Sequence, residues 1–174
     1  MNPLKEYQIH FVGLELGNHK LEFEVDDKFF EQFEFSQIKQ GKVLVNIDLE
    51  KMARLMVFNF DLEGSVRVTC DRCSNEFDLP ISDKQKLIVK FGLDYMEESD
   101  DVIVIPETDH KFDVAPYIYE FIHLALPVRS VHPDDEHGNS TCDPDMMQRL
   151  EKLAPTEIHD PRWEALQKLK MDDK

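Results

Sequence analysis

The chain of 174 residues has no apolar run that approaches the roughly 20 residues that a membrane-spanning helix needs. Its first residues also lack the basic-then-apolar layout of a secretion signal, so we expect a cytoplasmic protein without membrane contact. Basic residues are scarce, because 20 lysines and arginines stand against 36 aspartates and glutamates, a formal charge of -16. Such a charge repels phosphate, which disfavours broad contact with naked nucleic acid and fits a basic protein partner better.

Cysteine is almost absent as well. Three cysteines in a chain without an export signal argue against a disulfide framework, and they turn attention to metal or thiol chemistry. Two of them form a Cys-x-x-Cys motif, Cys70-Asp71-Arg72-Cys73, between two stretches in which apolar residues alternate with polar ones. This pattern predicts a β-hairpin with two thiols at its tip.

Short alternating stretches fill the first two thirds of the chain. They predict strands near 21–25, 43–49, 56–62, 66–70, 77–81, 87–91 and 102–105, with turns at 63–65 and 82–83. Brief turns between such strands favour an antiparallel meander sheet or an open barrel over βαβ units. Helical spacing appears later, near 116–127, 146–150 and 160–169. We therefore predict an α+β fold, with C-terminal helices packed on the sheet.

The length favours a single domain spanning residues 1–174. Residues 1–110 are expected to be mostly β and residues 111–174 mostly helical. Between the predicted helices lies a polar loop, 127–144, that is long for a compact domain. Long loops of this kind usually bind something or are disordered, so this loop is a candidate source of ligands.

A structural zinc ion prefers four ligands at tetrahedral corners, with thiolates and imidazoles favoured. Cys70 and Cys73 supply two ligands, and Cys142 in the loop supplies a third. The fourth is His132 or, as an alternative, His137, and the spacing leaves this choice open. A closed site would tie the β half to the C-terminal half, whereas the opposing interpretation makes Cys142 an incidental loop thiol.

The same cysteines raise the alternative of a zinc-dependent or thiol-dependent enzyme. A redox Cys-x-x-Cys usually begins a helix, whose dipole stabilises the thiolate, but the residues after Cys73 alternate as a strand. A nucleophilic Cys142 paired with a histidine has no identifiable orienting partner. We predict that the protein is not an enzyme, and a general protein-interaction module is the remaining alternative.

Four short motifs in order resemble the YceD family, bacterial and plastid proteins named for large ribosomal RNA subunit accumulation. They are Val68-Thr69-Cys70-Asp71-Arg72-Cys73, Leu124-Ala125-Leu126-Pro127, the loop with His132 and Cys142, and the segment from Asp160-Pro161-Arg162-Trp163 to Leu169. The resemblance implies a cytoplasmic, non-enzymatic factor for accumulation or processing of 23S ribosomal RNA during large-subunit assembly. It also implies a large-subunit ribosomal protein or a pre-ribosomal particle as the partner.

Some members of that family carry a second Cys-x-x-Cys after the helix, where this chain has His132 and Cys142. The resemblance therefore transfers only Cys70 and Cys73 as ligands. Three arginines around the hairpin form a local basic patch that can contact RNA or a protein partner, although the net charge disfavours ribosomal RNA: Arg67, Arg72 and Arg129.

Overall fold

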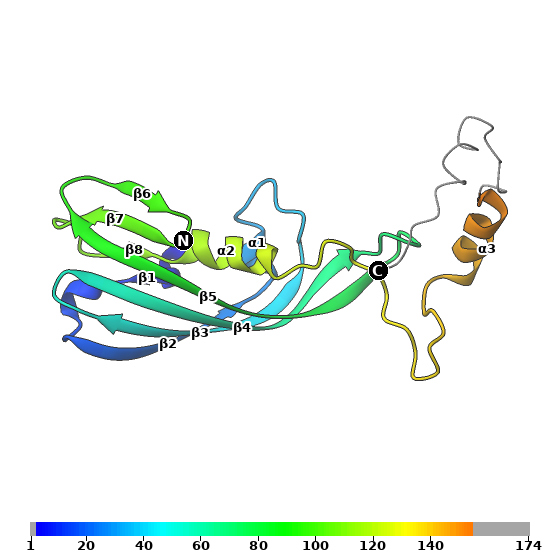
Figure 1. The fold of residues 1–174 in the computed structure, drawn as a ribbon, viewed down its shortest axis with the longest axis horizontal. Helices are drawn as coiled ribbons and strands as arrows, with labels where there is room; N and C mark the ends of the chain where they lie inside the picture. The colour runs from blue at the N-terminus through cyan, green and yellow to red at the C-terminus, as the bar shows by residue number, and fades with distance from the viewer. Residues whose placement is uncertain (1–2, 155–174) are drawn as a thin grey trace, which may run out of the picture.

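The structure, a computed structural model, describes residues 3–154 and is shown in Figure 1. Strands account for most of the elements, and the helices are short. In chain order the elements are η1 (Pro3–Tyr7), β1 (Gln8–Ile9), η2 (Phe11–Gly13), β2 (Gly17–Val25), α1 (Asp27–Phe30), β3 (Gly41–Lys51), β4 (Leu55–Thr69), β5 (Glu76–Gly92), β6 (Met96–Ser99), β7 (Val102–Pro106), β8 (Phe112–Asp113), α2 (Ala115–Leu124) and α3 (Pro144–Leu153).

The main sheet is open, with the strand order β2-β3-β4-β5-β7-β6. The first four strands form the predicted antiparallel meander. The sheet is not antiparallel throughout, however, because β7 pairs with β5 in parallel while β6 takes the outer edge. A two-stranded sheet of β1 and β8 joins the N-terminal segment to the residues before α2. The prediction of an α+β fold with an open sheet is confirmed.

The two predicted turns at 63–65 and 82–83 are wrong, because β4 and β5 run through these positions without a break. Their alternation of buried and exposed side chains continues, with Leu62 and Val66 buried and Glu63 exposed. The outer face of the sheet meets solvent, so polar and small residues belong in these strands. A cluster of such residues resembles a turn in the sequence.

The main core lies between the inner face of the sheet and the elements that cover it. Ile118, Phe121 and Ile122 of α2 are buried in this core, at the helical spacing read from the sequence. The ring of Phe121 lies edge-on to that of Phe60 in β4, with 5.0 Å between the centroids. α2 is therefore held against the sheet by apolar packing.

The β4–β5 hairpin extends past the end of β3, and Figure 1 shows its tip projecting away from the rest of the sheet. A second and smaller apolar cluster surrounds this tip, separate from the main core. α3 packs Met146 and Met147 against this second cluster, so it does not cover the sheet as predicted for the C-terminal helices. The predicted helix at 160–169 lies outside the described residues.

No helix within residues 3–154 is both long enough and apolar enough to span a membrane.

Candidate metal centre

The tip of the β4–β5 hairpin holds Cys70 and Cys73 in a tight turn. The backbone N–H of Cys70 donates to the carbonyl of Asn75 at 2.8 Å, and that of Ser74 donates to the carbonyl of Cys70 at 2.9 Å. Ser74 has a φ of 62°, in the left-handed region that a tight turn requires. Both thiols are buried on the same side of the tip.

The segment after α2 returns to this tip and docks on it. The N–H of Asp71 donates to the carbonyl of Ser130 at 2.7 Å, and the N–H of Ser130 donates to a carboxylate oxygen of Asp71, also at 2.7 Å. Asn75 donates to the carboxylate of Asp143, which caps α3. These reciprocal bonds place the loop so that His132 and Cys142 face the hairpin.

Three sulfurs and one imidazole nitrogen meet between the tip and the loop. These atoms belong to Cys70, Cys73, His132 and Cys142, and all lie within 4.8 Å of one another. The Cys70 and Cys142 sulfurs are 3.8 Å apart, and His132 Nδ1 lies 3.5 Å from the Cys73 sulfur and 3.8 Å from that of Cys142.

These separations can be compared with those around a metal ion. Zn–S bonds of about 2.3 Å and Zn–N bonds of about 2.0 Å in a tetrahedron separate two sulfurs by about 3.8 Å and a sulfur from a nitrogen by about 3.5 Å. The observed distances are close to these values, so the arrangement is compatible with one tetrahedral zinc ion. All four corners are then occupied by protein atoms.

The hairpin turn also prepares Cys70 for metal binding. Burial raises the pKa of this thiol, but hydrogen bonds from the backbone N–H groups of Cys73 and Arg72, together with those from His132, outweigh burial, and the pKa is lowered to about 5. Arg72 N lies 3.4 Å from the sulfur. A thiol with this pKa is a thiolate at neutral pH, which is the form that binds metals.

Cys142 differs from Cys70 in its electrostatic surroundings. A hydrogen bond with Ser140 lowers its pKa, but burial and the adjacent sulfurs of Cys70 and Cys73 raise it, and the net direction is upward. Three sulfurs held this close repel one another when all are ionised. A bound cation offsets this repulsion, because it neutralises the thiolate charge.

Phe77 is a further residue of this site, and no motif in the sequence singles it out. Its ring stacks on that of His132, with centroids 4.4 Å apart, and it belongs to the same buried cluster as the three cysteines. The stack orients the imidazole toward the thiols. The only signal in the sequence was the alternation that places Phe77 on the same strand face as Leu79 and Ile81.

The other predicted site residues lie around this centre. His137 is exposed and lies in a small loop closed by the Asp134–Ser140 bridge, and it is not part of the quartet. Arg67 pairs with Asp78 at 3.2 Å, Arg72 donates to Ser140 at 3.0 Å, and Arg129 is exposed beside Ser130. The structure thus groups His132 with the cysteines and leaves the arginines on the surrounding surface.

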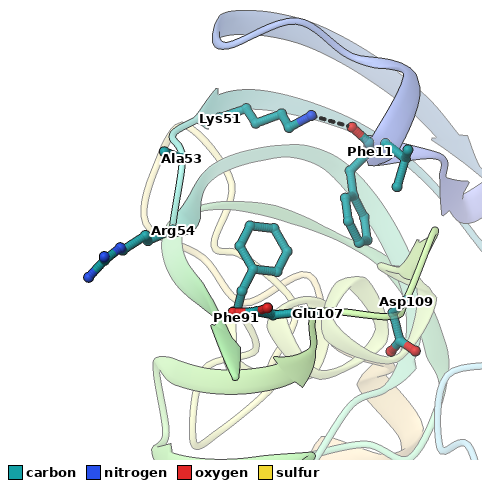
Figure 2. A pocket seen from close by; sticks show the side chains of 8 residues that line it. Phe11, Lys51, Ala53, Arg54, Phe91, Glu107 and Asp109 are labelled. Atoms are coloured by element: carbon teal, nitrogen blue, oxygen red, sulfur yellow. Dashed lines mark hydrogen bonds between the residues drawn. The ribbon is translucent and has the colours of Figure 1, made fainter. Parts of the chain in front are cut away.

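Another cavity lies far from this centre, at the opposite end of β4, and Figure 2 shows it. Its volume is about 620 Å³, and Phe11, Lys51, Phe91 and Asp109 are among the residues that line it. Lys51 Nζ donates to the carbonyls of Phe11 and Leu14 at 2.7 Å, so the lysine braces the N-terminal segment. The lining described for this cavity holds no Cys, His or Ser, and its carboxylates are those of Glu107 and Asp109.

The two loop histidines allow a matched test of the centre. Replacing His132 by alanine removes one of the four ligands. Zinc affinity should therefore fall by more than about 100-fold, which is the largest loss typical of removing a residue that only hydrogen-bonds to a ligand. Replacing His137 by alanine changes the same residue type in the same loop and should leave affinity unchanged. Competition with a chromogenic chelator measures both variants, and equal losses would contradict the assignment of His132.

Comparison with known proteins gives one match. A family model described as "Large ribosomal RNA subunit accumulation protein YceD" matches residues 58–170, a range that includes the whole quartet. The description names accumulation of a ribosomal RNA and no chemical reaction. Neither the curated proteins nor the solved structures include a significant match.

Proposed function

The chain belongs to the YceD family of large ribosomal RNA subunit accumulation proteins, and on that premise we propose a non-enzymatic factor that supports 23S ribosomal RNA accumulation and processing during large-subunit assembly. The family match carries this proposal, because it covers residues 58–170, well over half of the chain. The proposed mode of action is to hold a basic large-subunit ribosomal protein, alone or in a pre-ribosomal particle.

The charge of the chain supports a protein partner. With 36 acidic and 20 basic residues, the long-range field attracts lysine-rich and arginine-rich proteins and repels RNA. Two of the three arginines of the predicted contact patch are already engaged, Arg67 with Asp78 and Arg72 with Ser140. Arg129 is exposed and is the proposed remaining contact for RNA or for an acidic group of a partner.

We propose that Cys70, Cys73, His132 and Cys142 hold a structural zinc ion, which fastens the 127–153 segment to the hairpin. The quartet comes from both halves of the chain, so we propose that residues 1–174 form a single domain. The separations of the donor atoms support this assignment. Four protein ligands leave no position for a water molecule or substrate, which favours a structural role over a catalytic one.

Loss of the protein should therefore change the ribosome profile. In cells that lack it, sucrose gradients should show fewer large subunits relative to small subunits, and RNA analysis should show 23S precursors. Re-expression of the intact chain is the control and should restore both. An unchanged gradient and unchanged 23S processing would refute the assembly role.

A binding measurement separates the two classes of partner. The purified chain is titrated with individual large-subunit proteins and with 23S RNA at increasing salt. Attraction to a basic protein should weaken as salt rises, because screening reduces it, while binding to RNA should be weak at all salt concentrations. Tight RNA binding without protein binding would contradict the holding mechanism.

A further inference from the structure

A groove lies at the neck of the molecule, where the β4–β5 hairpin leaves the sheet, and it is lined by residues of β4 and of the segment after α2. Figure 1 shows the backbone of the hairpin leaving the sheet. It has a volume of about 330 Å³. We call it the neck groove. The residues that line it include Ile38, Val68, Thr69, Leu126, Pro127 and Val128.

Exposed apolar side chains lie in the segments that line the neck groove and in the residues just before them. Val128 is fully exposed, and Leu124, one turn earlier at the end of α2, is 61% exposed. Phe35 is 89% exposed in the segment between α1 and β3 that also supplies Ile38. A group of exposed apolar side chains beside a groove marks an interaction surface more often than solitary exposed residues do.

The backbone of β4 is open at the floor of this groove. In this part of β4 the backbone N–H and C=O groups of even-numbered residues bond to the β5 side, as the bond from Cys70 N to Asn75 O shows. The backbone N–H and C=O groups of odd-numbered residues therefore point away from β5. On that side Arg67 N donates to Gln40 O at 2.8 Å, and Asp71 N donates to Ser130 O at 2.7 Å. Thr69 lies between them, and its N–H and C=O have no hydrogen-bond partner within residues 3–154.

An open backbone position between two satisfied ones, flanked by apolar side chains, suits an extended peptide. The peptide's backbone can exchange hydrogen bonds with Thr69, while an apolar side chain packs against Val68, Leu126 and Val128. We propose that the neck groove binds an extended segment of a basic protein, which inserts an apolar side chain between lysines or arginines.

The charge of the chain selects this occupant. The lining of the groove includes the carboxylate of Asp71 and no lysine or arginine, so the arginine patch lies outside it. A net charge of -16 attracts a basic segment, whereas a second copy of the chain brings the same negative charge and RNA brings phosphates. The proposal that the groove binds a peptide rests on the geometry of the groove. Only the identification of the partner as a ribosomal protein rests on the proposed function.

Photo-crosslinking tests the occupant directly. Val128 is replaced by p-benzoylphenylalanine, and the purified chain is mixed with the proteins extracted from large ribosomal subunits. Leu93, which is 93% exposed in the segment after β5, carries the same replacement as the matched control. We expect position 128 to crosslink to an extended lysine-rich or arginine-rich segment and position 93 not to. Equal crosslinking at both positions, or crosslinks from 128 only to a second copy or to added 23S RNA, would overturn the proposal.

Two further measurements keep this test independent of folding and of the ribosome. Val128→Asp should weaken binding of the crosslinked segment, made as a synthetic peptide, by about tenfold or more, the effect of losing a central contact. Leu93→Asp should leave binding unchanged.

Hydrogen exchange of the Thr69 amide should slow when the peptide binds, while exchange of the already bonded Arg67 amide should not change. No slowing at Thr69 would contradict the backbone contact.

The outcomes also separate this proposal from the proposed function. If cells without the protein show a normal ribosome profile, the assembly role fails, but a peptide that binds the groove still supports the inference. If the profile is altered and Val128→Asp binds the segment as well as the unchanged chain does, the assembly role stands and the neck groove is refuted.

Discussion

Replacing both Cys70 and Cys73 by serine is expected to abolish zinc binding and to release residues 127–153 from the hairpin tip, while the main sheet stays folded. The reason is the division of the molecule into two apolar clusters. The cluster at the tip contains few buried side chains, chiefly the three cysteines and Phe77. A cluster of that size needs a metal to be stable, and in such sites the free energy of metal binding is the free energy of folding.

Metal analysis and hydrogen exchange measure the two parts of this prediction. Zinc content should fall from about one ion per chain to near zero. Amides in 127–153 should exchange rapidly in the variant, whereas buried positions of the sheet such as Val45 and Leu62 should remain protected. Treating the unchanged chain with a chelator should reproduce the same pattern. Equal zinc content in both chains, or loss of protection throughout the sheet, would contradict the assignment.

The hairpin and its two cysteines were predictable because local pattern determines them. Alternation fixes the strands on either side, and two cysteines separated by only two residues must lie in the same turn. The choice between His132 and His137 was not predictable, because both lie in one loop within reach of the thiols. Contacts far apart in sequence decide it, since Asp71 binds Ser130 and Phe77 stacks on His132.

The strands of the sheet were largely predicted, but their lengths were not. The segments 63–65 and 82–83 contain residues that also form turns, and a single sequence does not show that β4 and β5 face each other there. Pairing supplies the missing information, as in the cross-strand contact between Asp61 and Lys84 at 2.7 Å. The parallel pairing of β5 with β7 was also missed, because strand order depends on contacts that local alternation does not report.

Replacing Gly64 by alanine is expected to lower the free energy of unfolding by about 3 kcal/mol, at the upper end of what overpacking costs. Gly64 lies in the middle of β4 opposite Val43 of β3. A Cβ there would lie 2.2 Å from the carbonyl oxygen of Lys42 and 2.6 Å from the Cα of Val43. Both atoms belong to the backbone, so relief requires β3 and β4 to move apart.

Urea unfolding of this variant beside Gly13→Ala tests whether Gly64 is a strand residue or the turn residue that the sequence suggested. A Cβ at Gly13 has no neighbour within 4 Å, so that substitution should change stability by no more than about 0.5 kcal/mol. Gly64 is not among the glycines with positive φ, so glycine is needed at this position because two strands approach closely there. If Gly64→Ala were as mild as Gly13→Ala, β4 could not pass so close to β3 at this point, and the continuous strand that carries Cys70 out to the metal centre would be wrong.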